Sequence, residues 1–145
     1  MNILVSACLL GVKCRYDGND NKSDILIKLI SKGYNLIPIC PEQLGGLPTP
    51  RKPAEIINRN VINKDNEDVT ENFINGANEV LKLSKLYNAE LAILKERSPS
   101  CGFGEIYDGT FNKVLIKGNG ICADLLSNNN VKIIGECKIK EYFEL

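Results

Sequence analysis

The sequence predicts one α/β domain: a mostly parallel sheet with flanking helices, in a Rossmann-like three-layer arrangement. Three observations lead to this prediction. Short apolar runs alternate with helix-like segments along the chain, as in parallel βαβ folds. The runs are apolar almost throughout, which is typical of strands buried on both faces. The 145 residues suffice for one hydrophobic core and contain no linker or repeat, so residues 1–145 are expected to form a single domain.

The expected strands are apolar runs that stop abruptly at a polar loop. They cover residues 2–7, 34–39, 89–95 and 131–135. The first three runs each lead to a cysteine in the loop that follows them.

Three segments have helical periodicity and recognisable ends. They cover about 24–32, 69–87 and 121–128. Ser23 is a candidate cap for the first helix, and Gly33 ends it. Asp68 and Glu71 form an expected capping box at the start of the second helix.

The remaining segments are expected to be irregular or small. Residues 40–53 are rich in proline and include a Gly-Gly pair, so a stiffened loop rather than a helix is expected. Residues 55–57 and 60–62 fit a small hairpin, and 104–111 are rich in turn residues. The tail, 138–145, alternates charged and apolar residues and is expected to dock on the sheet.

Composition excludes several classes of function. The formal net charge is zero, which argues against a generic binder of nucleic-acid duplexes or anionic membranes. No apolar run approaches the ~20 residues of a membrane span. The run ending at Cys8 resembles a lipoprotein cleavage site but lacks a basic segment before it, so a cytoplasmic, reducing location is expected.

The six cysteines and the absence of histidine narrow the chemistry further. In a reducing compartment, cysteines are metal ligands or reactive thiols more often than disulfides. Without histidine there is no Cys/His zinc site and no imidazole base, so protons must move through carboxylates, hydroxyls or water.

Cys8, Cys40 and Cys101 each follow an expected strand. Because ligands bind at the carboxyl ends of parallel strands, these thiols are expected to converge on one site. Three thiolates without imidazole suit an iron–sulfur cluster that leaves one iron open as a Lewis acid. The competing interpretation is that they are buried structural cysteines. That interpretation is preferred for Cys122 and Cys137, whereas Cys14 could be a bystander, a fourth ligand or a sulfur shuttle.

Seven motifs stand out along the chain. They are Ser6-Ala7-Cys8-Leu9-Leu10-Gly11, Cys14-Arg15-Tyr16-Asp17-Gly18, Cys40-Pro41-Glu42, Leu44-Gly45-Gly46-Leu47-Pro48-Thr49-Pro50-Arg51, Asp68-Val69-Thr70, Arg97-Ser98-Pro99-Ser100-Cys101-Gly102 and Ile106-Tyr107-Asp108-Gly109-Thr110-Phe111. Together they resemble the thiouracil desulfidase family over nearly the whole chain and in the same order.

The resemblance implies a compact α/β fold with a [4Fe-4S] cluster on Cys8, Cys40 and Cys101. It also implies non-redox removal of sulfur, as sulfide, from a thiolated pyrimidine base or nucleotide such as 2-thiouracil or 4-thiouridine monophosphate. Glu42 matches the family's catalytic acid. Ser98 or Ser100 matches its catalytic hydroxyl, and Ser100 is preferred because it adjoins Cys101. Cys122 departs from the family pattern, which has a small hydroxyl residue there.

Alternatives remain beside this hypothesis. A non-catalytic iron–sulfur or metal and sulfur carrier would need the cysteines but not Glu42. A metal-free thiol enzyme could use Cys101 as its nucleophile, although no histidine would activate it. A phosphate could bind the helix start at Gly118-Asn119-Gly120, or pair with one of the cations Arg15, Arg51, Lys95 and Arg97.

Overall fold

The computed structural model describes residues 1–145 and has a four-stranded parallel sheet at its centre. The strands are β1 (Asn2–Ser6), β2 (Asn35–Ile39), β5 (Leu91–Leu94) and β8 (Lys132–Gly135). Their order across the sheet is β2-β1-β5-β8, and every neighbouring pair is parallel. The predicted α/β fold class is therefore confirmed.

Two small antiparallel hairpins accompany the sheet. One pairs β3 (Ala54–Ile57) with β4 (Asn60–Asn63), as predicted. The other pairs β6 (Glu105–Tyr107) with β7 (Leu115–Lys117), where only turns were predicted.

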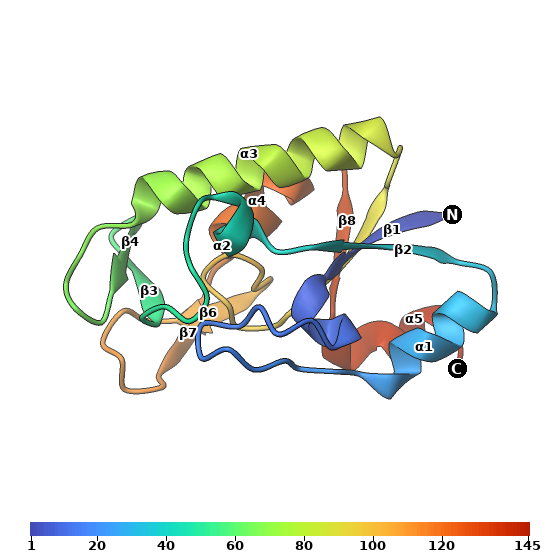
Figure 1. The fold of residues 1–145 in the computed structure, drawn as a ribbon, viewed down its shortest axis with the longest axis horizontal. Coiled ribbons are helices and arrows are strands. Elements are labelled where there is room, and N and C mark those ends of the chain that lie inside the picture. Colours follow the sequence, from blue (N-terminus) through green and yellow to red (C-terminus); the bar gives the residue numbers. More distant parts are fainter.

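Helices cover both faces of the sheet, which makes the arrangement three-layered (Figure 1). On one face α3 (Thr70–Leu86) and α4 (Ile121–Asn128) pack against Leu4, Ala92 and Ile133. On the other face α1 (Asp24–Ser31), α5 (Ile139–Phe143) and the 3-10 helix η1 (Ala7–Leu10) enclose a second core. A second short 3-10 turn, η2 (Glu136–Lys138), leads into α5. The buried Ile139 confirms that the tail docks against the sheet.

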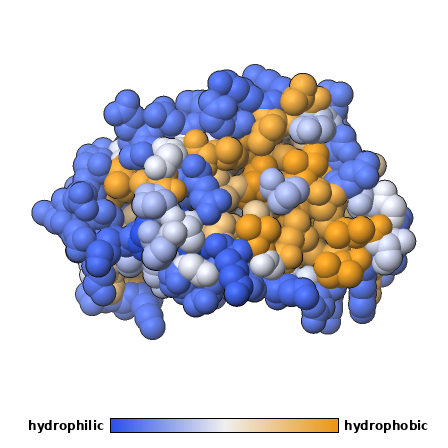
Figure 2. All heavy atoms as spheres, in the orientation of Figure 1, coloured by the Kyte–Doolittle hydropathy of each residue, from blue (hydrophilic) through white to orange (hydrophobic).

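The central strands are buried on both faces, as their apolar sequences predicted. Ile3, Leu4 and Val5 of β1 are fully buried, and all four residues of β5 are buried. Strand β2 lies at the edge, where Pro38 is tolerated because an edge strand can lack one N–H donor. Figure 2 shows apolar atoms gathered on the side of the molecule that carries β2 and α1.

Two predictions about helix starts are wrong in detail. The carboxylate of Asp68 accepts a hydrogen bond from the N–H of Thr70, so it closes a turn before α3 instead of capping the helix. The Thr70 hydroxyl accepts from the N–H of Val61 and thereby ties α3 to β4. Ser23 does stand at the N-cap position of α1, as predicted, but its side chain makes no capping hydrogen bond.

The loop predicted over residues 40–53 also contains a helix, α2 (Pro41–Leu44). Pro41 stands in the first turn, where proline is favoured because that N–H has no partner within a helix. Gly45 and Gly76 allow α2 to approach α3 closely, since a Cβ on Gly76 would lie 1.8 Å from the Pro41 carbonyl oxygen. This contact fixes α2, and with it Cys40 and Glu42, against the longest helix of the fold. None of the helices has the length and apolarity that crossing a bilayer requires.

Candidate functional site

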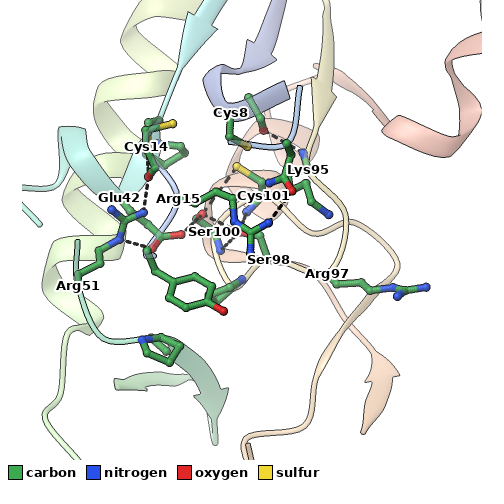
Figure 3. A pocket seen from close by; sticks show the side chains of 18 of the residues that line it. Cys8, Cys14, Arg15, Glu42, Arg51, Lys95, Arg97, Ser98, Ser100 and Cys101 are labelled. Carbon is green, nitrogen blue, oxygen red and sulfur yellow. Dashed lines mark hydrogen bonds and ion pairs between the residues drawn. The ribbon is translucent and has the colours of Figure 1, made fainter. Parts of the chain in front are cut away.

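Three cysteines lie at the carboxyl ends of the three adjacent strands β2, β1 and β5. Cys8 is in η1 directly after β1, Cys40 is the residue before α2, and Cys101 is in the loop after β5. All three line one pocket of about 430 Å³. Figure 3 labels two of them, Cys8 and Cys101, beside Cys14. The predicted convergence of Cys8, Cys40 and Cys101 is present because the sheet order places their strands side by side.

Cys14 is a fourth thiol in the same pocket. It is 3% exposed, and the Cys40 Sγ donates to its carbonyl oxygen at 3.9 Å. Hydrogen bonding by the Cys14 thiol lowers the pKa of Cys8 to about 7 and that of Cys40 to about 6. The same bonds raise the pKa of Cys14 far above its usual value. Cys14 is therefore a neighbour of two predicted ligands, not a distant bystander.

Cys101 has a different environment. Burial raises the pKa of its thiol to about 12, although hydrogen bonds with Ser6 and Ser100 partly oppose this effect. Its Sγ lies 3.7 Å from the Ser100 Oγ. Deeper in the core, burial also raises the pKa of Cys122. Cys122 lies inside α4 and Cys137 is exposed, so neither lines the pocket.

Glu42 lies in the same pocket and is held from two sides. Its Oε2 accepts a hydrogen bond of 2.8 Å from the Ser100 hydroxyl, and its Oε1 accepts one of 3.0 Å from Nε of Arg51. The Arg51 side chain is 7% exposed and also donates to the carbonyl oxygens of Pro48 and Cys14 and to the hydroxyl of Thr49. Arg51 thus joins the loop that carries Cys14 to the carboxylate of Glu42.

The serine turn forms a directed chain of hydrogen bonds. The N–H groups of Ser100 and Cys101 donate to the Ser98 hydroxyl oxygen, at 3.1 and 3.0 Å. The two hydroxyls lie 2.9 Å apart. Because the hydrogen of Ser100 points at Glu42, Ser98 must donate to Ser100. Ser98 and Ser100 therefore both belong to the site, and only Ser100 touches Glu42.

The start of α4 supports this turn from behind. The N–H groups of Ile121 and Cys122 donate to the carbonyl oxygens of Pro99 and Ser100, both at 2.9 Å. The suggested phosphate site at Gly118-Asn119-Gly120 is therefore wrong, because the N–H groups of the helix start are already used by the serine turn.

The four suggested phosphate-binding cations differ in their surroundings. Arg51 pairs with Glu42, Lys95 with Glu136, and Arg15 with Asp17. Figure 3 shows the Arg97 side chain directed away from the other labelled residues.

The other walls of the pocket come from residues that local sequence patterns did not identify. Three aromatic side chains line it: Tyr16 from the loop after Cys14, and Tyr107 and Phe111 from hairpin β6–β7. Glu55 of β3 and the lysines Lys64 and Lys113 complete this side. The motifs that contain Tyr16, Tyr107 and Phe111 were visible in the sequence, but nothing local to them indicated a shared pocket.

Comparisons with known proteins agree with this arrangement. Residues 3–138 match a family described as 2-thiouracil desulfurase. A relative from Bacillus subtilis (strain 168), the uncharacterized protein YbbK, is 42% identical over 96% of this chain and 98% of its own length. A solved structure described as the [4Fe-4S]-dependent thiouracil desulfidase TudS superposes with a TM-score of 0.91 at 42% identity, covering 97% of this chain and 93% of that one. The chain thus belongs to the 2-thiouracil desulfurase family.

Proposed function

We propose that this protein is an iron–sulfur-dependent desulfidase that removes sulfur from a thiolated pyrimidine without net oxidation or reduction. The observation that carries the proposal is the meeting of three strand-end cysteines and the Glu42–Ser100 hydrogen bond in one pocket. The cysteines could hold a soft metal cofactor, and the carboxylate could handle a proton beside it.

The donor set fits a [4Fe-4S] cluster held by Cys8, Cys40 and Cys101. All three side chains are thiols on separate elements, and they face a pocket with room beside them. When bound on three cysteines, such a cluster would supply an open iron with Lewis acidity and affinity for sulfur.

The protein's own groups would take up the protons of the attacking water and position the acceptor carboxylate. Replacing the thiocarbonyl sulfur by oxygen consumes one water, whose oxygen becomes the carbonyl oxygen and whose two protons leave with the sulfur as hydrogen sulfide. Glu42 would accept one of these protons, and Ser100 would hold the carboxylate in position through its hydrogen bond. Ser98 would orient Ser100 and hold the loop at Cys101.

The walls support a flat, polar heterocycle as substrate. Tyr16, Tyr107 and Phe111 offer aromatic surfaces on which a pyrimidine can stack. Lys64 and Lys113 line the pocket without a carboxylate partner, which favours a substrate that also carries a phosphate. The proposed substrates are 2-thiouracil and 4-thiouridine monophosphate.

The test is anaerobic reconstitution followed by incubation with each substrate. We expect about four irons per chain on three cysteine ligands, with sulfide and the oxygenated pyrimidine released in equal amounts. Protein stripped of iron is the control and should be inactive. Four irons without sulfide release would reject the enzyme and favour a carrier, whereas full activity without iron would favour the thiol enzyme.

A further inference from the structure

Glu55 is a buried carboxylate in the pocket wall that no step proposed above uses. It is 9% exposed, and no lysine or arginine pairs with it. Instead its Oε1 accepts hydrogen bonds from the N–H groups of Gly109 and Phe111, at 3.0 and 3.1 Å. A buried carboxylate without a counter-charge is costly unless it is well hydrogen-bonded, so these bonds hold the loop 108–111 firmly to β3.

The loop that Glu55 holds has an uncommon backbone. Gly109 has a φ of +95° and Phe111 a φ of +59°, and both lie in the left-handed region. Phe111 carries a bulky side chain in this conformation, which persists only where the surroundings enforce it. Gly109 also lies directly against β3, because a Cβ there would be 2.5 Å from Cγ1 of Ile57. Such enforced conformations gather at ligand clamps.

The same hairpin supplies a wall of the pocket. Tyr107, Phe111 and Lys113 all line it. Glu55 accepts a hydrogen bond from the N–H of Phe111 itself and one from the N–H of Gly109, two residues after Tyr107. If the wall is already ordered before the substrate binds, binding does not have to offset the entropy lost in ordering these side chains. Glu55 is in the right place to provide this order.

We propose that Glu55 is a positioning residue that fixes the aromatic wall made by Tyr107 and Phe111, and thereby sets the affinity of the pocket for a pyrimidine. The inference rests on the proposed function for the identity of the ligand. It assigns Glu55 no contact with the substrate and no proton transfer. Its effect should therefore fall on substrate binding and leave the chemical step unchanged.

The experiment compares two substitutions in the anaerobically reconstituted full chain. Glu55→Met has a similar size but no acceptor, so both N–H groups lose their partner. Glu55→Gln keeps an amide oxygen that can accept both bonds. The measurements are the Kd of 2-thiouracil by calorimetry, KM and kcat for sulfide release, and iron per chain.

We expect Glu55→Met to raise Kd and KM about tenfold, with kcat within about twofold and iron unchanged, because two or so wall side chains must be ordered on binding. Glu55→Gln should remain close to the wild type. The control, Glu67→Met, removes an exposed carboxylate of the neighbouring β4 turn that accepts from Asn63 and should change none of the measurements.

An unchanged KM in Glu55→Met would overturn the inference while leaving the desulfidase proposal intact. Equal impairment of Glu55→Gln and Glu55→Met would also overturn it, since the charge itself would then matter. If Glu55→Met fails to fold, Gly109→Ala is the second variant. Its added Cβ would push the loop away from Ile57 of β3, so it should raise KM although Glu55 is still present. If 2-thiouracil binds without sulfide release, the desulfidase proposal is rejected. The Kd values of the Glu55 variants then decide whether Glu55 orders the pocket wall.

Discussion

Ser100 donates a hydrogen bond of 2.8 Å to Oε2 of Glu42, and this bond joins two loops that are 58 positions apart in the chain. The other carboxylate oxygen is held by Arg51 at 3.0 Å. With both oxygens engaged, the carboxylate has a defined orientation before any substrate enters, which is the kind of support that precise proton transfer needs.

Glu42→Gln is expected to retain iron but to lose the desulfidase rate by about 10²- to 10⁴-fold, the usual contribution of a positioned acid or base. Glutamine keeps the shape of the side chain and can still accept from Arg51, but it cannot take a proton from water. The measurement is kcat for sulfide release alongside iron content. Glu67→Gln, an exposed carboxylate outside this pocket, is the matched control. A wild-type rate in Glu42→Gln would remove Glu42 from the chemistry and favour a carrier.

Substitution of the two serines is expected to affect different properties: Ser100→Ala the rate, and Ser98→Ala the stability. Ser100→Ala removes the hydroxyl that touches Glu42, so kcat should fall about tenfold or more while stability changes little. Ser98→Ala leaves the N–H groups of Ser100 and Cys101 without their acceptor, and an unpaired buried donor costs about 1–3 kcal/mol. Denaturant unfolding and kcat, measured on both variants, separate the effects. Equal losses of stability in the two would contradict the directed chain of hydrogen bonds.

Cluster ligation is tested one cysteine at a time. Alanine at Cys8, Cys40 or Cys101 should each lower the iron and acid-labile sulfide content after anaerobic reconstitution, because three thiolates are needed to hold the cluster. Cys137→Ala is the control, since that exposed thiol lies outside the pocket. Full iron content in any of the three pocket variants would show that another group serves as the ligand, and Cys14 is the one other thiol that lines the pocket.

The parallel sheet was predictable because its central strands β1 and β5 are buried on both faces. A short run that is apolar throughout, such as Leu91–Leu94, is typical of a buried parallel strand. From those strands the convergence of Cys8, Cys40 and Cys101 followed by topology alone. The hairpin β6–β7 was missed because its strands have three residues each and their side chains are largely exposed, which leaves a weak pattern. The helix α2 was missed because proline suggested a loop, although proline also suits a helix start.

Long-range pairs in the site could not be predicted from local patterns. Nothing near Arg51 in the sequence indicates that its guanidinium bonds to Glu42 and to the carbonyl of Cys14. Likewise Glu55 and Phe111 are 56 positions apart, and only the packing of hairpin β6–β7 against β3 brings them together. The positions of side chains that support a site depend on packing between elements, which local patterns do not reveal. The positions of ligand residues at strand ends follow from the topology of the sheet, which the strand pattern predicts.

Arg51→Met should lower the free energy of unfolding by about 3 kcal/mol, because breaking a buried ion pair leaves the remaining charge without a partner. It should also reduce kcat, since Glu42 then loses one of its two anchors. Arg51→Lys should restore little of either property, because one ammonium group cannot reproduce the fork that reaches Glu42, Thr49 and Pro48 together. Chemical denaturation and sulfide release are the two measurements. Recovery in the lysine variant would reduce the role of Arg51 to charge alone.

The last prediction concerns the contact between α4 and the serine turn. A Cβ on Gly120 would lie 2.5 Å from the carbonyl carbon of Ser100 and 2.9 Å from the N of Cys101, and backbone atoms cannot swing aside as a side chain can. Gly120→Ala should therefore displace the turn, cost about 1–3 kcal/mol of stability as overpacking does, and lower iron retention through Cys101. Gly118→Ala is a close control, because its Cβ meets only the side chain of Ile106, no nearer than 3.0 Å. Iron content and unfolding free energy that are the same in both variants would mean that the turn does not depend on its contact with the helix.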